Sequence, residues 1–236
     1  MTNDTLQLKF KERINKLASN DYDNIECWQI VEAFNKAQIE WIRRQLRGGN
    51  IFQDGDEQSV RRIDDLQRIL LQVDLPIQDQ GIYWDMVNEI PDNYLQYKRI
   101  DVKAKDECDE CPPRPMNVYL AEEANRAQLL RDDMKKPNYE WAETFATLID
   151  NKARIFTNNE FDLCDAELTY YRFPVNIQIL NCVDPYTGVA SVTNIDCEFK
   201  DDIVELMIDE AVAIVAADIE SGGQQGRGSE SAERSN

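Results

Sequence analysis

The segment from Ile25 to Arg47 constrains the fold more than any other part of the chain. Apolar residues recur along it at helical spacing and on a widened face, namely Trp28, Ile30, Val31, Phe34, Ile39, Trp41, Ile42 and Leu46. Gly48 and Gly49 then supply a helix stop. A helix that is apolar on more than one side packs against two neighbours or against another subunit. The sequence therefore predicts a long helix with two buried sides.

Other helices are expected on both sides of this segment. Residues 5 to 18 show a single apolar stripe, and residues 201 to 220 show a broad one that opens on two aspartates and closes on two glycines. The pattern also favours a helix over residues 58 to 72, built on Ile63, Leu66, Ile69 and Leu70. Residues 81 to 92 are expected to hold a further helical turn, and residues 122 to 133 another short helix.

The middle of the chain has the character of a sheet. Tyr94 to Lys105 alternates as a strand does, and Trp141 to Ile149 is compatible with either helix or strand. Residues 152–157 and 160–173 flank Asn158 and Asn159, which tolerate the positive φ of a tight turn, so we expect a β-hairpin there. Residues 175–180 are expected to form a further strand, and residues 184–188 a turn.

These elements predict an α+β fold in which the N-terminal helices pack with a long C-terminal helix, and a small antiparallel β region in the middle of the chain is inserted between them. The expected organisation is a helical region over residues 1–93, a β-rich region with one helix over 94–200, the C-terminal helix over 201–220 and a mobile tail over 221–236. The tail is expected to be mobile because it is rich in Gly, Ser and Gln and almost free of apolar residues.

Charge and composition exclude several classes of function. The 236 residues carry 26 basic and 45 acidic groups, a net charge of −19, and residues 101–236 account for −15 of it. Such a field disfavours tight non-specific binding to nucleic acid or anionic lipid. The chain has no histidine, which excludes Ser-His-Asp and Cys-His catalysis and imidazole metal sites. No stretch is long enough for a membrane span.

The six cysteines are expected to be free thiols. The N-terminus lacks the basic and apolar regions of a secretory signal, so we expect folding in a reducing cytoplasm. Cys108 and Cys111 form a CxxC pair. This spacing occurs in loops with free thiols, in structural zinc sites and in redox sites. The zinc site lacks a second close cysteine pair, and the intervening carboxylates and following prolines disfavour a redox role, so free loop thiols are favoured and no cofactor or metal is expected.

No catalytic motif is found. Paired carboxylates such as Asp132-Asp133 and Asp201-Asp202 lie at helix ends, where they cap the helix dipole. Phosphate-binding glycine motifs and the nucleophile elbow are missing from the sequence. We therefore expect a protein that is not an enzyme.

Arginines and aromatic residues supply the candidate contact residues. The long helix ends with Arg43, Arg44 and Arg47, and the next predicted helix carries Arg61, Arg62 and Arg68. These cations can offset the helix dipole and form a solvated face. Alternatively, they can contact an acidic partner or passing DNA. Tyr170, Tyr171 and Arg172 are of the types enriched in protein interfaces, although aromatic strands are also common in cores. The candidate interface residues are Trp28, Trp41, Arg43, Arg44, Arg47, Tyr170, Tyr171 and Arg172.

Four blocks of sequence resemble the ring proteins of crAss-like tailed bacteriophages. The blocks are IECWQIVEAFNKAQIEWIRRQLRGGN (25–50), DDLQ (64–67), LTYYRFPVNIQI (168–179) and CEFKDDIVELMIDEAVAIVAADIE (197–220). The resemblance runs over most of residues 1–221 and consists of packing and interface patterns, with no catalytic signature.

The resemblance implies a virion structural protein, an adaptor ring of the head-to-tail connector in the phage neck. Such a homododecamer would bind the portal on one side and neighbouring tail or ring proteins on the other, and would surround the DNA exit channel, with transient non-specific contact to passing DNA. It would assemble in the bacterial host cytoplasm and involve no membrane.

Two other functions remain open. The charge of −19 also suits an acidic soluble binding module or DNA mimic that binds a basic host protein. The many carboxylates leave room for a metal-dependent phage enzyme, provided that several of them converge in one cleft.

Overall fold

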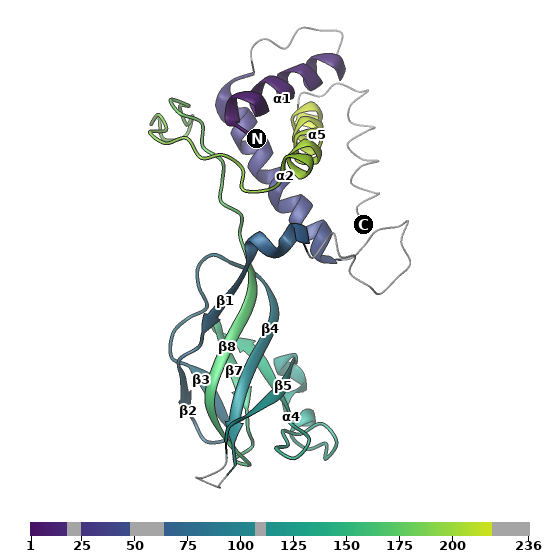
Figure 1. Ribbon diagram of the computed structural model, residues 1–236, viewed down its shortest axis with the longest axis vertical. Coiled ribbons are helices and arrows are strands. Elements are labelled where there is room, and N and C mark those ends of the chain that lie inside the picture. The colour runs from purple at the N-terminus through teal and green to yellow at the C-terminus, as the bar shows by residue number, and fades with distance from the viewer. Residues whose placement is uncertain (18–24, 48–63, 107–111, 219–236) are drawn as a thin grey trace. The chain divides into compact units, whose positions relative to one another are not determined.

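The computed structural model describes residues 1–17, 25–47, 64–106 and 112–218. The chain forms two compact units (Figure 1). The helical unit comprises Met1–Arg68 together with Pro174–Asn236, and the sheet unit comprises Ile69–Phe173. The sheet unit is thus an insertion between two parts of the chain that fold together.

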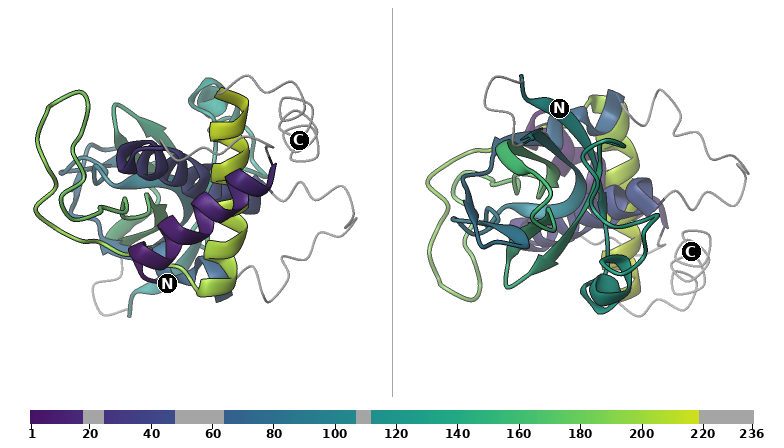
Figure 2. Two further views of the ribbon diagram at one scale, coloured as in Figure 1. Left: turned by 90° about the horizontal axis from the view of Figure 1, so that it is seen from above. Right: turned by 90° about the horizontal axis from the view of Figure 1, so that it is seen from below.

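Three long helices build the helical unit: α1 (Asn3–Leu17), α2 (Cys27–Arg47) and α5 (Asp201–Asp218). α5 contacts both α1 and α2, and α1 crosses it in the view from above (Figure 2, left). The predictions of helices over residues 5–18, 25–47 and 201–220 are confirmed within the described residues.

Apolar stripes hold these helices together. In α1, Leu6, Phe10 and Ile14 recur every four residues and are fully buried, as the helical period requires. In α5, apolar residues are buried on a broad face, namely Ile203, Val204, Met207, Ile208, Ala211 and Val212. The broad face is consistent with a helix that contacts two others.

Ion pairs flank the helix contacts. Lys9 and Arg13 of α1 both bind Glu205 of α5, and Arg13 also pairs with Asp209 at 2.8 Å. Arg44 of α2 binds Glu210 of α5. Burial raises the pKa of the Glu210 carboxyl, and the Arg44 guanidinium acts in the opposite direction. These pairs fix which faces of the helices meet.

An eight-stranded sheet forms the sheet unit. Its strands are β1 (Leu70–Asp74), β2 (Ile77–Asp79), β3 (Tyr83–Met86), β4 (Tyr94–Lys105), β5 (Arg114–Leu120), β6 (Glu143–Ile149), β7 (Lys152–Phe156) and β8 (Asp162–Arg172). They lie in the order β1-β8-β4-β5-β6-β7-β3-β2. All pairs are antiparallel except β5 and β6, whose crossover holds the 3-10 turn η2 (Glu123–Asn125) and the short helix α4 (Arg126–Leu129).

The sheet is curled (Figure 2, right), and its buried side chains form one apolar cluster. Buried side chains of β4, β7 and β8 pack together in this cluster, among them Val102, Ile155 and Leu168. Leu168 and Tyr170 of β8 are buried as well, and the Tyr170 hydroxyl donates to Asn93 at 2.9 Å. The sheet unit therefore has a core independent of the helices.

The predicted fold class is wrong. The β region is not small: an eight-stranded mixed sheet occupies residues 70–172, and helices are a minor part of the described chain. Residues 70–93, expected to be helical, hold β1, β2 and β3. Helical structure predicted over 58–72 reaches only residues 64–69, after which β1 begins and pairs with β8. Residues 58–63 lie outside the described part of the chain, as does the predicted mobile tail over 221–236.

Two strand predictions also need correction. Asn158 and Asn159 have positive φ as predicted, but β7 and β8 do not pair; β7 lies between β6 and β3. The tight hairpin joins β6 to β7 instead, through Asp150 and Asn151, which also have positive φ. Residues 175–180 form no named strand and take part only in the isolated bridge between Gln178 and Ile195.

Other predictions for this region agree with the structure. The strand Tyr94–Lys105 is confirmed, residues 143–149 are a strand, and the helix expected over 122–133 is present as the short pieces η2 and α4. Among the described residues, no helix combines the length and apolar composition needed to cross a bilayer.

The sheet core yields a stability prediction. Replacing the fully buried Leu168 by Ala removes apolar contacts and leaves a cavity, so we expect the free energy of unfolding to fall by about 2–5 kcal/mol. Leu120→Ala is the matched control, because Leu120 is 41% exposed, and should cost less than about 0.5 kcal/mol. Urea unfolding followed by circular dichroism measures both. Equal costs for the two variants would contradict the assignment of the core.

Candidate interaction surface

Residues 175–195, here called the arm, lie between β8 and α5 in sequence and form a long loop beside the helices (Figure 1). The arm is held at its base by two asparagines. Asn3 of α1 donates its amide to the carbonyls of Gln178 at 2.8 Å and Ile195 at 3.0 Å. The Asn35 side-chain oxygen of α2 accepts the Ile177 N–H at 2.9 Å. Both ends of the arm are thus fastened to helices.

The far end of the arm closes in a tight turn. Val183 and Ala190 form an isolated antiparallel bridge. Inside it, the Asp184 carboxylate accepts the Tyr186 N–H at 2.8 Å and the Thr187 hydroxyl at 3.0 Å. Gly188, with φ of 68°, donates its N–H to the Asp184 carbonyl. The predicted turn over 184–188 is confirmed, and it fixes the shape of the arm.

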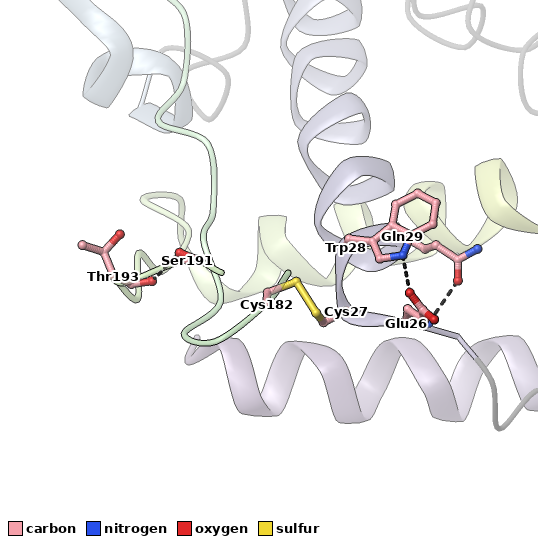
Figure 3. The surroundings of a disulfide bond; sticks show 7 residues. All are labelled: Glu26, Cys27, Trp28, Gln29, Cys182, Ser191 and Thr193. Atoms are coloured by element: carbon pink, nitrogen blue, oxygen red, sulfur yellow. Dashed lines mark hydrogen bonds between the residues drawn. A yellow bond between two sulfur atoms is a disulfide. The ribbon is translucent and has the colours of Figure 1, made fainter. Parts of the chain in front are cut away.

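A disulfide fastens the arm to the first turn of α2 (Figure 3). Cys27 and Cys182 are joined, with Cα atoms 5.8 Å apart and a sequence separation of 155. The prediction that all six cysteines are free thiols is therefore wrong. Cys164 is an exposed free thiol and Cys197 a buried one, while Cys108 and Cys111 lie outside the described residues.

Beside the disulfide lies an apolar groove of about 650 Å³. Trp28 and Val31 of α2 form one wall, and the arm forms the other with Ile179, Val189 and Val192. The Trp28 indole N–H is already satisfied by Glu26 (Figure 3), so the ring offers mainly its apolar surface.

The outer part of the arm exposes an unusual number of large apolar side chains. Tyr186 is 82% exposed, Val192 86% and Val189 65%, and Leu180 and Val183 are each about half exposed. Tyr186, Val189 and Val192 line the same groove, and exposed apolar patches are typical of sites of protein contact. We refer to the arm and the groove together as the arm surface.

The arm is also nearly free of charge. Asp184 is the one charged residue among positions 175–195, whereas charged residues make up 30% of the chain. The Asp184 carboxylate is itself engaged in the turn. The arm therefore carries little charge in an otherwise strongly acidic protein, although Glu32 of α2 also lines the groove beside it.

Among the predicted interface residues whose side chains the structure describes, Trp28 is the one that lies at the arm surface. Trp41 is 5% exposed and meets Phe199 edge to face at 5.6 Å, so it packs inside the helical unit. Tyr170 and Tyr171 are buried in the sheet unit. Their aromatic pattern reflects core packing, the alternative considered for such strands.

The predicted arginines are not gathered at this surface. Arg43 is exposed on α2, Arg44 binds Glu210, and Arg172 donates to the Phe173 carbonyl at 3.0 Å. The side chain of Arg47 is not described, and Arg61 and Arg62 lie outside the described residues. Arg68 donates to the backbone carbonyl of Glu198, within the helical unit.

Sequence reasoning missed the residues that define the arm surface, above all Cys182, Tyr186 and Val192. The sequence could have indicated the arm, because positions 175–195 hold a single charged residue in a chain with 30% charged residues. Nothing in the sequence indicated that Cys27 pairs with Cys182, since Cys27 is distant in sequence and belongs to no motif.

No group of three or more cysteine and carboxylate side chains that could hold a metal ion occurs within residues 1–17, 25–47, 64–106 and 112–218. No protein-family model and no curated protein matches the sequence of this chain.

The disulfide yields the second prediction. The double variant Cys27→Ala/Cys182→Ala should unfold with a free energy lower by about 2–5 kcal/mol, because the unfolded chain regains the freedom that a long closed loop removes. Thermal unfolding under non-reducing conditions measures this. Cys164→Ala removes an exposed unpaired thiol and serves as the control, with little change expected. A double variant as stable as the control would contradict the assignment.

The buried thiol yields the third. Burial raises the pKa of Cys197 to about 11, and Gln38 accepts its S–H. Because only the thiolate reacts, Cys197 should resist iodoacetamide near neutral pH, and its labelling should speed up about tenfold per pH unit below about 11. Peptide mass spectrometry compares it with the exposed Cys164 in the folded chain. Equal labelling rates for the two thiols would refute this.

Proposed function

We propose that this chain is a virion structural protein that forms a ring in the neck of a tailed bacteriophage. The ring joins the portal to the tail and surrounds the DNA exit channel. The role is structural and not enzymatic. The observation that carries the proposal is the arm surface, an exposed apolar and nearly uncharged projection on a chain of net charge −19.

The arm surface supports an assembly function because exposed apolar surface of this extent is costly on a lone soluble subunit. Its anchoring also matters. Both ends of the arm are fastened by Asn3 and Asn35 and its middle by the Cys27–Cys182 bond, so binding to a partner orders little additional chain. A preorganised apolar projection is well suited to a permanent contact.

The blocks that resemble crAss-like phage ring proteins also support the proposal. Block 25–50 contains α2, block 168–179 leads into the arm, and block 197–220 contains α5. α2 packs on α5 and carries the disulfide to the arm. Residues 25–47, 174–179 and 201–218 of these blocks thus belong to the helical unit although they are distant in sequence, whereas residues 168–173 belong to the sheet unit.

The negative net charge is suited to the wall of a channel through which DNA must pass without binding. Like charge repels the phosphate backbone, so a negatively charged channel would let DNA slide during packaging and ejection. A ring of identical copies also needs two different complementary patches on each subunit, because its contacts run head to tail. The arm surface would supply at least one of these patches.

The charge of −19 also favours a second candidate, an acidic binding module or DNA mimic. That function predicts capture of a basic host protein and no place in the particle. It leaves the apolar arm surface without a role, and for that reason we prefer the neck ring.

The composition of purified virions provides the test. Quantitative mass spectrometry of particles freed of unassembled protein should find this chain in the same copy number as the portal, as a dodecameric ring on a dodecameric portal requires. The major capsid protein and a non-virion phage protein provide the upper and lower references. Absence from particles, together with recovery on a basic host protein, would favour the DNA mimic.

A further inference from the structure

We propose that the Cys27–Cys182 bond is a reversible redox latch that holds the outer part of the arm, residues 179–193, against α2. When the bond is reduced, this outer part separates from α2 and the groove beside Trp28 opens, while the three long helices stay packed. The inference goes beyond the proposed function and does not depend on it, because it concerns two states of the arm and not what the arm binds.

The base of the arm is held without the disulfide. Asn35 of α2 accepts the Ile177 N–H at 2.9 Å. Asn3 of α1 donates its amide to the carbonyls of Gln178 and Ile195. All of these bonds lie outside the outer part of the arm, so reduction of the disulfide leaves the base in place.

The outer part has no comparable bond to a helix within the described part of the chain. Its hydrogen bonds run inside the arm: the Ser191 N–H donates to the Cys182 carbonyl at 2.8 Å, and the Asn181 N–H donates to the Ser191 carbonyl at 2.9 Å. Among the described residues, no hydrogen bond or ion pair joins residues 179–193 to α1, α2 or α5. The disulfide therefore fastens the outer arm to α2 (Figure 3).

Packing holds the outer part only at its inner end. Ile179 and Cys182 are each 8% exposed, but Tyr186, Val189 and Val192 are each at least 65% exposed. A segment with few buried apolar contacts opens at a low free energy. Once the covalent bond is removed, little opposes the separation of the outer arm from α2.

The groove is formed only while the outer arm lies on α2. Trp28 and Val31 of α2 form one wall, Ile179 and Val192 belong to the other, and Cys182 itself lines the groove. Separation of the two walls removes the groove. The redox state of a single bond therefore sets whether the groove is formed.

Thiol–disulfide exchange with a dithiol opens the latch. A thiolate of the dithiol attacks the sulfur of Cys27, which is more exposed than that of Cys182, and Cys182 leaves as a thiolate that takes up a proton. The second thiol of the dithiol then displaces Cys27 from the mixed disulfide, and the dithiol leaves as a cyclic disulfide. Two electrons and two protons pass to the cysteines, and exchange with a small disulfide reverses the step.

Thiol labelling of the full wild-type chain tests the latch. The chain is reduced with dithiothreitol, freed of it and pulsed with N-ethylmaleimide, and peptide mass spectrometry gives the labelling rate of each cysteine. Each rate is divided by the rate of the same thiol in urea, so that differences in local sequence cancel. Cys197 is the matched control, because it lies in the same unit and is 7% exposed, against 8% for Cys182.

Release of the outer arm should expose Cys182 and leave Cys197 covered. In the reduced chain we expect Cys182 to react within about tenfold of its rate in urea, whereas Cys197 stays protected by about a hundredfold or more. Cys27→Ser leaves Cys182 without its partner and should give the same result without any reductant.

Four results would overturn the proposal. If Cys182 stays as protected as Cys197, packing and not the bond holds the outer arm. If both lose protection equally, the bond stabilises the whole helical unit and is not a latch. A bond that dithiothreitol reduces only in urea, or a chain in which both Cys27 and Cys182 are free thiols before reduction, also contradicts it.

Discussion

The anchoring of the arm to the helices is the interaction on which the rest of the account depends. Without the Cys27–Cys182 bond and the hydrogen bonds from Asn3 and Asn35, residues 175–195 would be an apolar loop with many conformations, and ordering it on a partner would cost much of the binding energy. With them, its apolar side chains and the groove beside Trp28 are presented in one arrangement. The packing of α5 on α1 and α2 supplies the rigid base for these fastenings.

Local periodicity predicted the three long helices and the strand Tyr94–Lys105 but not the rest of the sheet, for physical reasons visible in particular residues. Leu6, Phe10 and Ile14 form a stripe that only a helix can bury together, so α1 was predictable. Leu66, Ile69 and Leu70 fit a helical period equally well, yet Leu70 begins β1, because pairing with Tyr171 of β8 outweighs local preference. Asn158 and Asn159 revealed a turn but not which strands it joins, since β7 pairs with β3 and β6.

The candidate site shows the same limit. Aromatic and arginine content pointed to Trp41, Tyr170 and Tyr171, which the fold buries, and only Trp28 lies at the arm surface. Residue type does not distinguish a core aromatic from an interface aromatic. The Cys27–Cys182 pair depends on the return of the chain after the whole sheet unit, and no spacing rule reveals such a pair. The scarcity of charged residues in the arm can be seen in the sequence, because it is a property of composition and does not depend on the fold.

In the proposed function, the acidic groups keep DNA and unwanted partners from binding, and the arm surface, which has few charged residues, forms the assembly contact. Electron cryomicroscopy of the neck in intact particles tests its central claim most directly. The account predicts a closed ring of density between portal and tail into which the helical and sheet units can each be fitted. A well-resolved neck in which every density belongs to other proteins would contradict it.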